Sequence, residues 1–178
     1  MNRFIAVVFL ALLAQQGHAQ DVPRVSAQIS RNGFKVSGDV EVQATRALAW
    51  EALTDYEGWA RFLPDLQVSR IVSRTPLRIA QRGSLPWLPG IPIVVLADVV
   101  EQPKTKLSFS KIQGNVMFLE GEWRISGKDG ALRLDYHAEV IPGFPLPANL
   151  SVELVQKDTR ARVEAMAEEI LRRASQEK

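Results

Sequence analysis

Residues able to carry acid–base or metal chemistry are few in this sequence. It contains two histidines, His18 and His137, and no cysteine. A hydrolytic triad needs a base beside the nucleophile, most often a histidine, and a zinc site combines several His, Cys or carboxylate ligands. His137 alternates with Tyr136 and Ala138 on a predicted strand, so we expect its side chain to point into solvent. The pattern predicts no triad, no metal site and no cofactor.

Carboxylates are the remaining candidates for catalysis. Glu120 and Glu122 share one face of a predicted strand, and we expect that face to be wet. Asp98 differs because it stands within a run of aliphatic residues. Two interpretations of Asp98 stay open: an ion pair with an arginine such as Arg70 or Arg82, or a functional carboxylate inside a pocket. No catalytic residue is predicted.

The first 19 residues have the pattern of a secretory signal peptide. Arg3 gives a short basic start, residues 4–14 are apolar, and Gly17 and Ala19 are small residues at the positions that a signal peptidase reads. The apolar run is about 11 residues, shorter than the roughly 20 that cross a bilayer. We expect a protein secreted across the inner membrane into the periplasm. An uncleaved membrane anchor is the alternative.

The mature chain has the size and charge of a single ligand-binding domain. Removal of 19 residues from 178 leaves 159, enough for one domain with a sizeable core. Arg3 is one of 22 basic residues, so 21 remain against 20 acidic residues. This near-neutral balance lacks the excess of basic residues that is typical of nucleic-acid-binding domains. We expect a monomer or weak dimer, with transient contact with a membrane surface.

The strongest structural signal is a long amphipathic helix over residues 147–173. Its apolar stripe recurs at steps of three and four residues, the period of a helix and not of a strand. The stripe consists of Val152, Val155, Thr159, Val163, Met166 and Ile170. Pro147 suits the first helical turn because its missing N–H would have no partner there. A helix of about 25 residues is roughly 37 Å long, so one broad surface must receive the stripe.

Alternating segments upstream provide that surface. Asn32 and Gly33 tolerate positive φ between two alternating runs, which predicts a β-hairpin; a surface loop ahead of a single strand is the alternative. Two short helices follow, at residues 47–56, capped by Thr45, and 59–63, ended by Pro64. Strands are predicted at 68–73, 77–83, 91–100, 107–112, 117–125 and 132–140. The order predicts an α+β fold in which a curved antiparallel sheet wraps the last helix.

Four stretches carry a family resemblance: residues 40–45 (VEVQAT), 49–57 (AWEALTDYE), 62–64 (FLP) and 144–147 (FPLP). They resemble the START-like (SRPBCC) superfamily, and within it the polyketide cyclase/dehydrase and coenzyme Q-binding branch. The resemblance implies the helix-grip fold, with residues 20–33 as an N-terminal lead and first hairpin strand and 34–175 as a START-like ligand-binding domain. It also implies a hydrophobic ligand between sheet and long helix. Only some branches are enzymes, so the resemblance bears on fold more than on reaction.

Two proline-rich loops, residues 85–92 and 142–147, place apolar side chains on backbone that cannot join a sheet. We expect them to flank the opening of a cavity of roughly a few hundred Å³; two stiff turns that cap the core are the alternative. The predicted ligand-binding residues are Gln81, Trp87, Phe109, Trp123, Leu134, Tyr136, Phe144, Val155, Thr159, Val163 and Met166. Of these, we expect Gln81, Tyr136 and Thr159 to make polar contacts with the ligand.

These features predict an exported binding protein for a hydrophobic small molecule, such as a lipid, a quinone or a polyketide-like compound. Two alternatives stay open. A cyclase- or dehydratase-type enzyme would use the same cavity and would need an inward-facing carboxylate or tyrosine, because no histidine faces inward. A partner-binding module would have a filled core and would use its exposed apolar residues, Val94 and Leu96. Enzymatic activity is not predicted.

Overall fold

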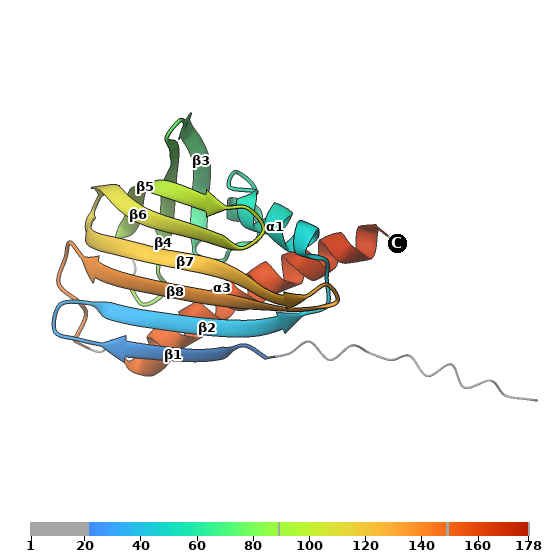
Figure 1. Cartoon of the computed structure of the whole chain (residues 1–178). Helices are drawn as coiled ribbons and strands as arrows, with labels where there is room; N and C mark the ends of the chain where they lie inside the picture. The colour runs from blue at the N-terminus through green and yellow to red at the C-terminus, as the bar shows by residue number, and fades with distance from the viewer. Residues whose placement is uncertain (1–21, 89, 149, 178) are drawn as a thin grey trace, which may run out of the picture.

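The computed structural model describes residues 22–88, 90–148 and 150–177. They form one antiparallel sheet and three helices (Figure 1). The elements are β1 (Arg24–Ile29), β2 (Phe34–Val42), α1 (Arg46–Thr54), α2 (Trp59–Phe62), β3 (Leu66–Arg74), β4 (Leu77–Ser84), β5 (Pro92–Gln102), β6 (Lys106–Gly114), β7 (Val116–Lys128), β8 (Ala131–Pro142) and α3 (Val152–Gln176). The expected signal peptide, residues 1–19, lies outside the described residues. Over the described ranges, no helix combines the length and apolar character that crossing a membrane requires.

The eight strands are ordered β1-β2-β8-β7-β6-β5-β4-β3, and each neighbouring pair is antiparallel. Pairing of β2 with β8 joins the first hairpin to the last strand. The sheet curves around α3, which crosses one of its faces (Figure 1). The predicted α+β architecture is confirmed: a curved antiparallel sheet wraps the long C-terminal helix, with two short helices after the first hairpin.

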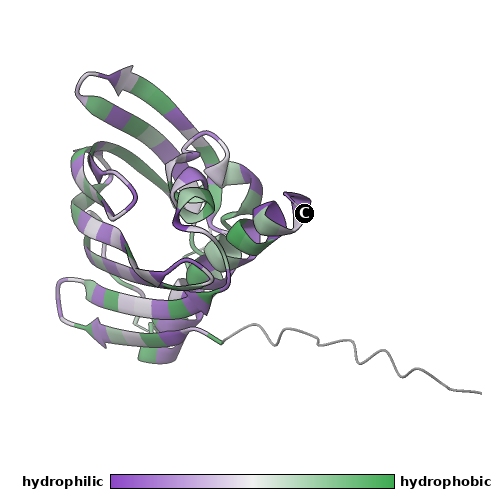
Figure 2. Ribbon diagram, turned by 45° about the vertical axis from the view of Figure 1, so that its right-hand side comes forward, coloured by the Kyte–Doolittle hydropathy of each residue, from purple (hydrophilic) through white to green (hydrophobic). Residues whose placement is uncertain are grey.

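Alternation along the strands determines which face of the sheet meets α3. Hydrophobic and hydrophilic residues follow one another along the strands (Figure 2). On β8, Leu132, Leu134, Tyr136 and Ala138 are buried, whereas the alternating residues Arg133 and His137 are exposed. Since successive side chains of a strand point to opposite faces, one face of the sheet is apolar and packs inward while the other meets water.

Helix α3 begins at Val152, five residues after the predicted start at Pro147. The side chain of Ser151 caps it by accepting a hydrogen bond from the Leu154 N–H at 3.3 Å. Pro147 instead belongs to a preceding turn, in which its carbonyl accepts from the Leu150 N–H at 3.0 Å. Val152, at the predicted start of the stripe, is partly exposed as a result. The remaining stripe residues are all buried: Val155, Thr159, Val163, Met166 and Ile170.

The predicted hairpin forms, but its turn differs from the expected type. Neither Asn32 nor Gly33 has a positive φ. The turn has four residues and closes with a hydrogen bond from the Ser30 N–H to the Gly33 carbonyl at 2.8 Å. Gly33 is needed for a close approach: a Cβ atom there would lie 2.1 Å from the carbonyl oxygen of Val140. The absence of a side chain therefore lets the turn approach β8.

The sequence pattern misplaces one residue of β7. Met117 alternates with Leu119 and Trp123 in the sequence, which predicts that all three face inward, but Met117 is 70% exposed. A shift in the register of β7 with β8 falls between Val116 and Phe118. Such a bulge reverses the alternation on one side of it, so Val116 is buried in place of Met117.

Ion pairs fasten the C-terminal half of α3 to α1. Arg173 binds Glu51 at 3.1 Å, Asp55 at 2.7 Å and Glu169 at 2.8 Å. Arg172 also binds Glu169 at 2.7 Å, and this bond is the main cause that lowers the pKa of the Glu169 carboxyl. The network covers the last buried turns of α3 and fixes the end of the helix against α1.

The two methionines of the described chain test the core. Met166→Ala removes a side chain with no exposed surface and leaves a cavity, so we expect a loss of about 2–5 kcal/mol in the free energy of unfolding. Met117→Ala, at the exposed bulge, should change it by less than about 0.5 kcal/mol. Urea unfolding followed by circular dichroism measures both values. Equal effects of the two substitutions would contradict the assignment of Met166 to the core.

Candidate functional site

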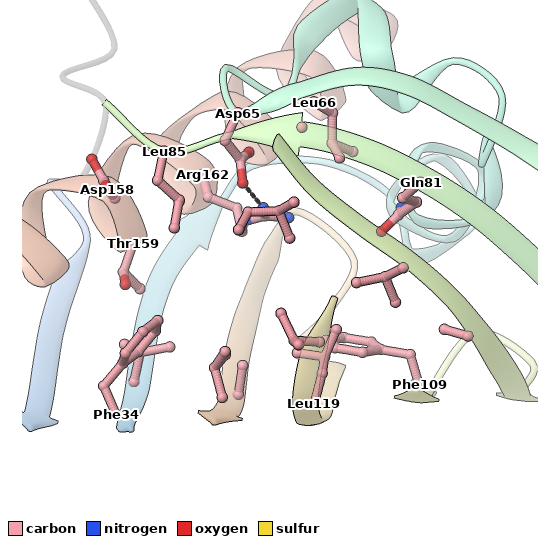
Figure 3. A pocket seen from close by; sticks show the side chains of 18 of the residues that line it. Phe34, Asp65, Leu66, Gln81, Leu85, Phe109, Leu119, Asp158, Thr159 and Arg162 are labelled. Carbon is pink, nitrogen blue, oxygen red and sulfur yellow. Dashed lines mark hydrogen bonds and ion pairs between the residues drawn. The ribbon is translucent and has the colours of Figure 1, made fainter. Parts of the chain in front are cut away.

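A cavity lies between α3 and the concave face of the sheet (Figure 3). Its volume is about 180 Å³. An engineered apolar cavity of about 150 Å³ holds a benzene molecule, so the cavity accepts a ring-sized ligand without rearrangement. It is smaller than expected because aromatic side chains occupy part of the space. The aromatic lining residues are Phe34, Trp59, Trp87, Phe109, Trp123, Tyr136 and Phe144.

Uneven packing of α3 creates the cavity. The nearest neighbours of α3 along the backbone are β1, β2 and the two short helices. On the strands farther along the sheet, small residues line the gap: Gly83 on β4, Ala97 on β5 and Ala138 on β8. Leu132 and Leu134 fill the corresponding positions near the other end of β8. The decrease in side-chain volume along the inner face leaves space opposite the N-terminal half of α3.

The structure brings together eight of the eleven predicted ligand-binding residues at this cavity. They are Gln81, Trp87, Phe109, Trp123, Tyr136, Phe144, Val155 and Thr159. Leu134, Val163 and Met166 do not line it; they are fully buried in the hydrophobic core. The prediction included four stripe residues of α3, whereas only the two nearest its N-terminus, Val155 and Thr159, line the cavity. Contact of the eight residues with a ligand stays a prediction.

A charged pair that the sequence analysis missed lies in this apolar cavity. Asp65 precedes β3, Arg162 is on α3, and the Arg162 guanidinium donates to Asp65 Oδ2 (Figure 3). The other carboxylate oxygen, Oδ1, is buried and has no hydrogen-bond partner among the described residues. Burial lowers the pKa of Arg162 to about 10, so the guanidinium stays charged at neutral pH.

Backbone contacts explain the position of Asp65. Its carbonyl oxygen accepts a hydrogen bond from the Ser84 N–H at 3.0 Å. A Cβ atom at Gly83 would lie 2.1 Å from that oxygen, so only glycine permits the close approach of the segment to β4. The carboxylate is therefore held by the sheet edge, whereas its partner Arg162 is held by the helix.

A second carboxylate connects α3 to the loop between β4 and β5. The indole N–H of Trp87 donates to Asp158 Oδ2, and the Trp87 ring meets Phe34 edge-on, with ring centroids 6.2 Å apart. Burial is the main cause that raises the pKa of the Asp158 carboxyl. Trp87 thus ties one proline-rich loop to the helix at the edge of the cavity.

The three polar side chains among the predicted ligand-binding residues, Gln81, Tyr136 and Thr159, differ in whether they already form hydrogen bonds within the protein. Thr159 Oγ1 donates to the Val155 carbonyl at 2.9 Å, and Gln81 Nε2 donates to Ser69 Oγ at 3.4 Å. The ring of Tyr136 packs on Trp123, with centroids 4.6 Å apart. Burial raises the pKa of Tyr136, so its phenol stays protonated at neutral pH. The hydroxyl of Tyr136 is thus a neutral donor and acceptor.

Residues considered for catalysis lie on the outer face of the sheet. His137 is exposed there, as predicted. Asp98 also faces outward and binds Arg78 at 2.9 Å, not Arg70 or Arg82, because the β4–β5 register places Arg78 directly opposite. Glu122 is half-buried, and its hydrogen bond with Arg124 lowers its pKa. Over residues 22–88, 90–148 and 150–177, no cluster of three or more His, Cys, Asp or Glu side chains forms a metal site.

The sequence contained a signal for two of the missed residues. Asp158 and Arg162 stand three and seven positions after Val155, so they lie on the helix face that borders the apolar stripe. Their charge favoured assignment to the solvent side. Asp65 had no comparable signal because its place in the cavity depends on tertiary contacts of a loop.

Comparison with known proteins supports the fold. Residues 42–167 match the family described as polyketide cyclase/dehydrase and lipid transport. None of the curated proteins compared with the chain matches its sequence.

Similar solved structures include a START superfamily protein from Mycobacterium smegmatis, with 19% identity and a TM-score of 0.63 over 81% of this chain and 99% of that one. A STAR-related lipid transfer protein from Xanthomonas axonopodis has 15% identity and a TM-score of 0.66, covering 86% and 97%. An aromatase/cyclase from Streptomyces sp. R1128 has 17% identity and a TM-score of 0.63, covering 85% and 95%. At these identities the likeness shows a common fold.

Proposed function

Since the chain belongs to the polyketide cyclase/dehydrase and lipid transport family, we propose that it binds a hydrophobic small molecule between the sheet and α3. The ligand class is a lipid, a quinone or a polyketide-like compound. The observation that carries the proposal is the apolar cavity of about 180 Å³ in a chain whose core is otherwise closely packed. An empty apolar cavity costs stability in the unliganded protein, and a ligand that fills it recovers the lost contacts.

The lining of the cavity fits such a ligand. Val95, Ala97 and Val99 of β5 face α3 across the gap, and aromatic rings surround them. Transfer of apolar surface from water gains roughly 25 cal/mol per Å², and aromatic rings offer stacking surfaces for a flat molecule. The partner-binding alternative assumed a filled core, so the cavity argues against it.

The two proline-rich loops provide an entry route in this proposal. Leu85 and Trp87 of the β4–β5 loop, with Phe144 after β8, line the cavity. Release of the Trp87 indole from Asp158 would free the first loop from α3. A ligand larger than one ring needs more space than the cavity's volume of about 180 Å³, and movement of this loop would provide it.

A second candidate function is a cyclase- or dehydratase-type reaction in the same cavity. The specific observation that favours it is the inward position of Asp65 and Asp158 in the same cavity as the protonated phenol of Tyr136. Carboxylates and phenols in apolar sites serve as general acids and bases. An enzyme of this type needs an inward-facing carboxylate or tyrosine. Asp65 and Asp158 line the cavity, whereas Asp98 faces outward.

We further propose that the protein acts in the periplasm after export. The support is the signal-peptide pattern of residues 1–19, which lie outside the described residues. The absence of cysteine from the chain is compatible with any redox compartment.

A pair of substitutions on β5 tests ligand binding. Ala97→Phe places a ring in the cavity, and Val100→Phe places the same ring on the outer face, where Val100 is 62% exposed. We expect saturable uptake of the apolar fluorescent probe N-phenyl-1-naphthylamine by the parent protein and the Val100 variant, and a loss of at least about tenfold in affinity for the Ala97 variant. Equal uptake by all three proteins would place the probe elsewhere.

Mass spectrometry of the bound compound separates the carrier from the enzyme. The molecule that co-purifies with the protein is extracted, added back in excess and recovered after incubation. A carrier returns it with unchanged mass and structure, whereas a cyclase or dehydratase returns a cyclised or dehydrated product. Product formation that disappears in Asp158→Asn would favour the second candidate.

Expression of the full sequence in a Gram-negative bacterium tests export. We expect a periplasmic protein that begins at Gln20, measured by intact mass. A full-length product in the membrane fraction would favour the uncleaved anchor, and a full-length product in the cytosol would contradict export.

A further inference from the structure

One hydrogen-bonding position in the cavity has no partner. Asp65 Oδ1 is buried without a donor among the described residues, while Oδ2 accepts from Arg162. Buried polar atoms of folded proteins are nearly always paired, because an unpaired acceptor loses its hydrogen bond to water without replacement. The unpaired oxygen therefore calls for a donor that the described part of the chain does not supply.

Stability alone does not account for the pair. The two side chains are largely withdrawn from water, with 22% and 20% of their surface exposed. Such charges repay their desolvation best when their remaining hydrogen bonds are satisfied, and apolar side chains of similar volume are often as stable. Here one oxygen stays unsatisfied, although aliphatic residues such as Leu66 and Leu85 line the same cavity. A ligand group that donates to Oδ1 would satisfy this oxygen.

The charges select the kind of donor. Arg162 balances the charge of Asp65, so the pair is neutral as a whole. The ligand carboxylate of a fatty acid would bring an unbalanced negative charge beside Asp65 and Asp158. A pure hydrocarbon would leave Oδ1 unpaired. A neutral hydroxyl group donates one hydrogen bond and accepts another, so it satisfies Oδ1 without adding charge.

We propose that the cavity takes a neutral, ring-sized hydrophobic ligand with a hydroxyl group, such as a phenol or ring alcohol, whose O–H donates to Asp65 Oδ1. The inference rests on the proposed function and adds the chemical class of the ligand. Asp158 already accepts from Trp87, and Thr159 donates to its own helix. Asp65 Oδ1 is the fully buried acceptor without a donor among the described residues, and it orients the ligand hydroxyl in this proposal.

Three probes that differ in one group test the inference: naphthalene, 2-naphthol and 2-naphthoate. Their dissociation constants are measured by isothermal titration or fluorescence with the full mature chain. A hydrogen bond to a charged group corresponds to on the order of 10- to 100-fold in affinity. We expect 2-naphthol to bind at least about tenfold more tightly than naphthalene, and 2-naphthoate to bind more weakly than 2-naphthol.

Two variants and a control assign the effect to Asp65. Asp65→Asn leaves Arg162 without its counter-charge, so the preference should move from 2-naphthol toward 2-naphthoate. The double variant Asp65→Asn, Arg162→Gln keeps the site neutral and avoids a lone buried charge; it should lose the advantage of 2-naphthol over naphthalene. Asp98→Asn removes a carboxylate from an Asp–Arg pair on the outer face and should change none of the three affinities. Thermal melting verifies that each variant is folded.

The outcomes separate this inference from the proposed function. Equal affinities for naphthalene and 2-naphthol, an unchanged ratio in both Asp65 variants, or 2-naphthoate as the tightest probe would overturn the inference and leave a general hydrophobic carrier standing. Failure of all three probes to bind would overturn the proposed function, and the inference would fall with it.

Discussion

Burial of one helix face in a concave sheet is the interaction on which the structure depends. Val163, Met166 and Ile170 have no exposed surface, and their side chains fill the space between α3, the sheet and the two short helices. Arg173 adds ion pairs to α1 at the same end. The C-terminal half of α3 is therefore fixed on several sides. The N-terminal half extends from this anchored part over the sheet, where the cavity separates part of it from the inner strands.

A gradient of side-chain volume divides the interior into core and cavity. Along β8 the inward residues run from Leu132 and Leu134 through Tyr136 to Ala138 and Val140. The same helix that packs on the leucines leaves space above Ala138. Since protein interiors are close-packed elsewhere, a gap bordered by small residues on β4, β5 and β8 is specified by the sequence and does not arise from loose folding. Fold stability and ligand space are thus encoded in different parts of the same strands.

Elements with a regular period were predictable, and features made by tertiary contact were not. The stripe of α3 and the alternation of the strands identified the architecture, because burial of one face imposes a period on the sequence. The helix start was placed too early because Pro147 and Ser151 both suit a helix N-terminus, and only the cap at Ser151 is used. Met117 faced the wrong way because a bulge leaves no mark in the alternation. The cavity was expected from the two loops, yet its charged pair was missed, because charge on a helix is usually exposed and Asp65 is carried inward by a contact with β4.

The polar and apolar parts of the site differ in rigidity, and this difference assigns them separate roles. Asp65 is held through its backbone by β4, and Arg162 by a buried helix, so their geometry is present before any ligand binds. Preorganised groups improve affinity because binding does not have to order them. Trp87, by contrast, lies on a loop, and its indole N–H donates a hydrogen bond to Asp158 on α3. In the proposed function, exchange of a ligand would move this loop and leave the charged pair in place. The fixed pair would then determine affinity and chemical selectivity, whereas the contact between Trp87 and α3 would determine the rates of entry and release.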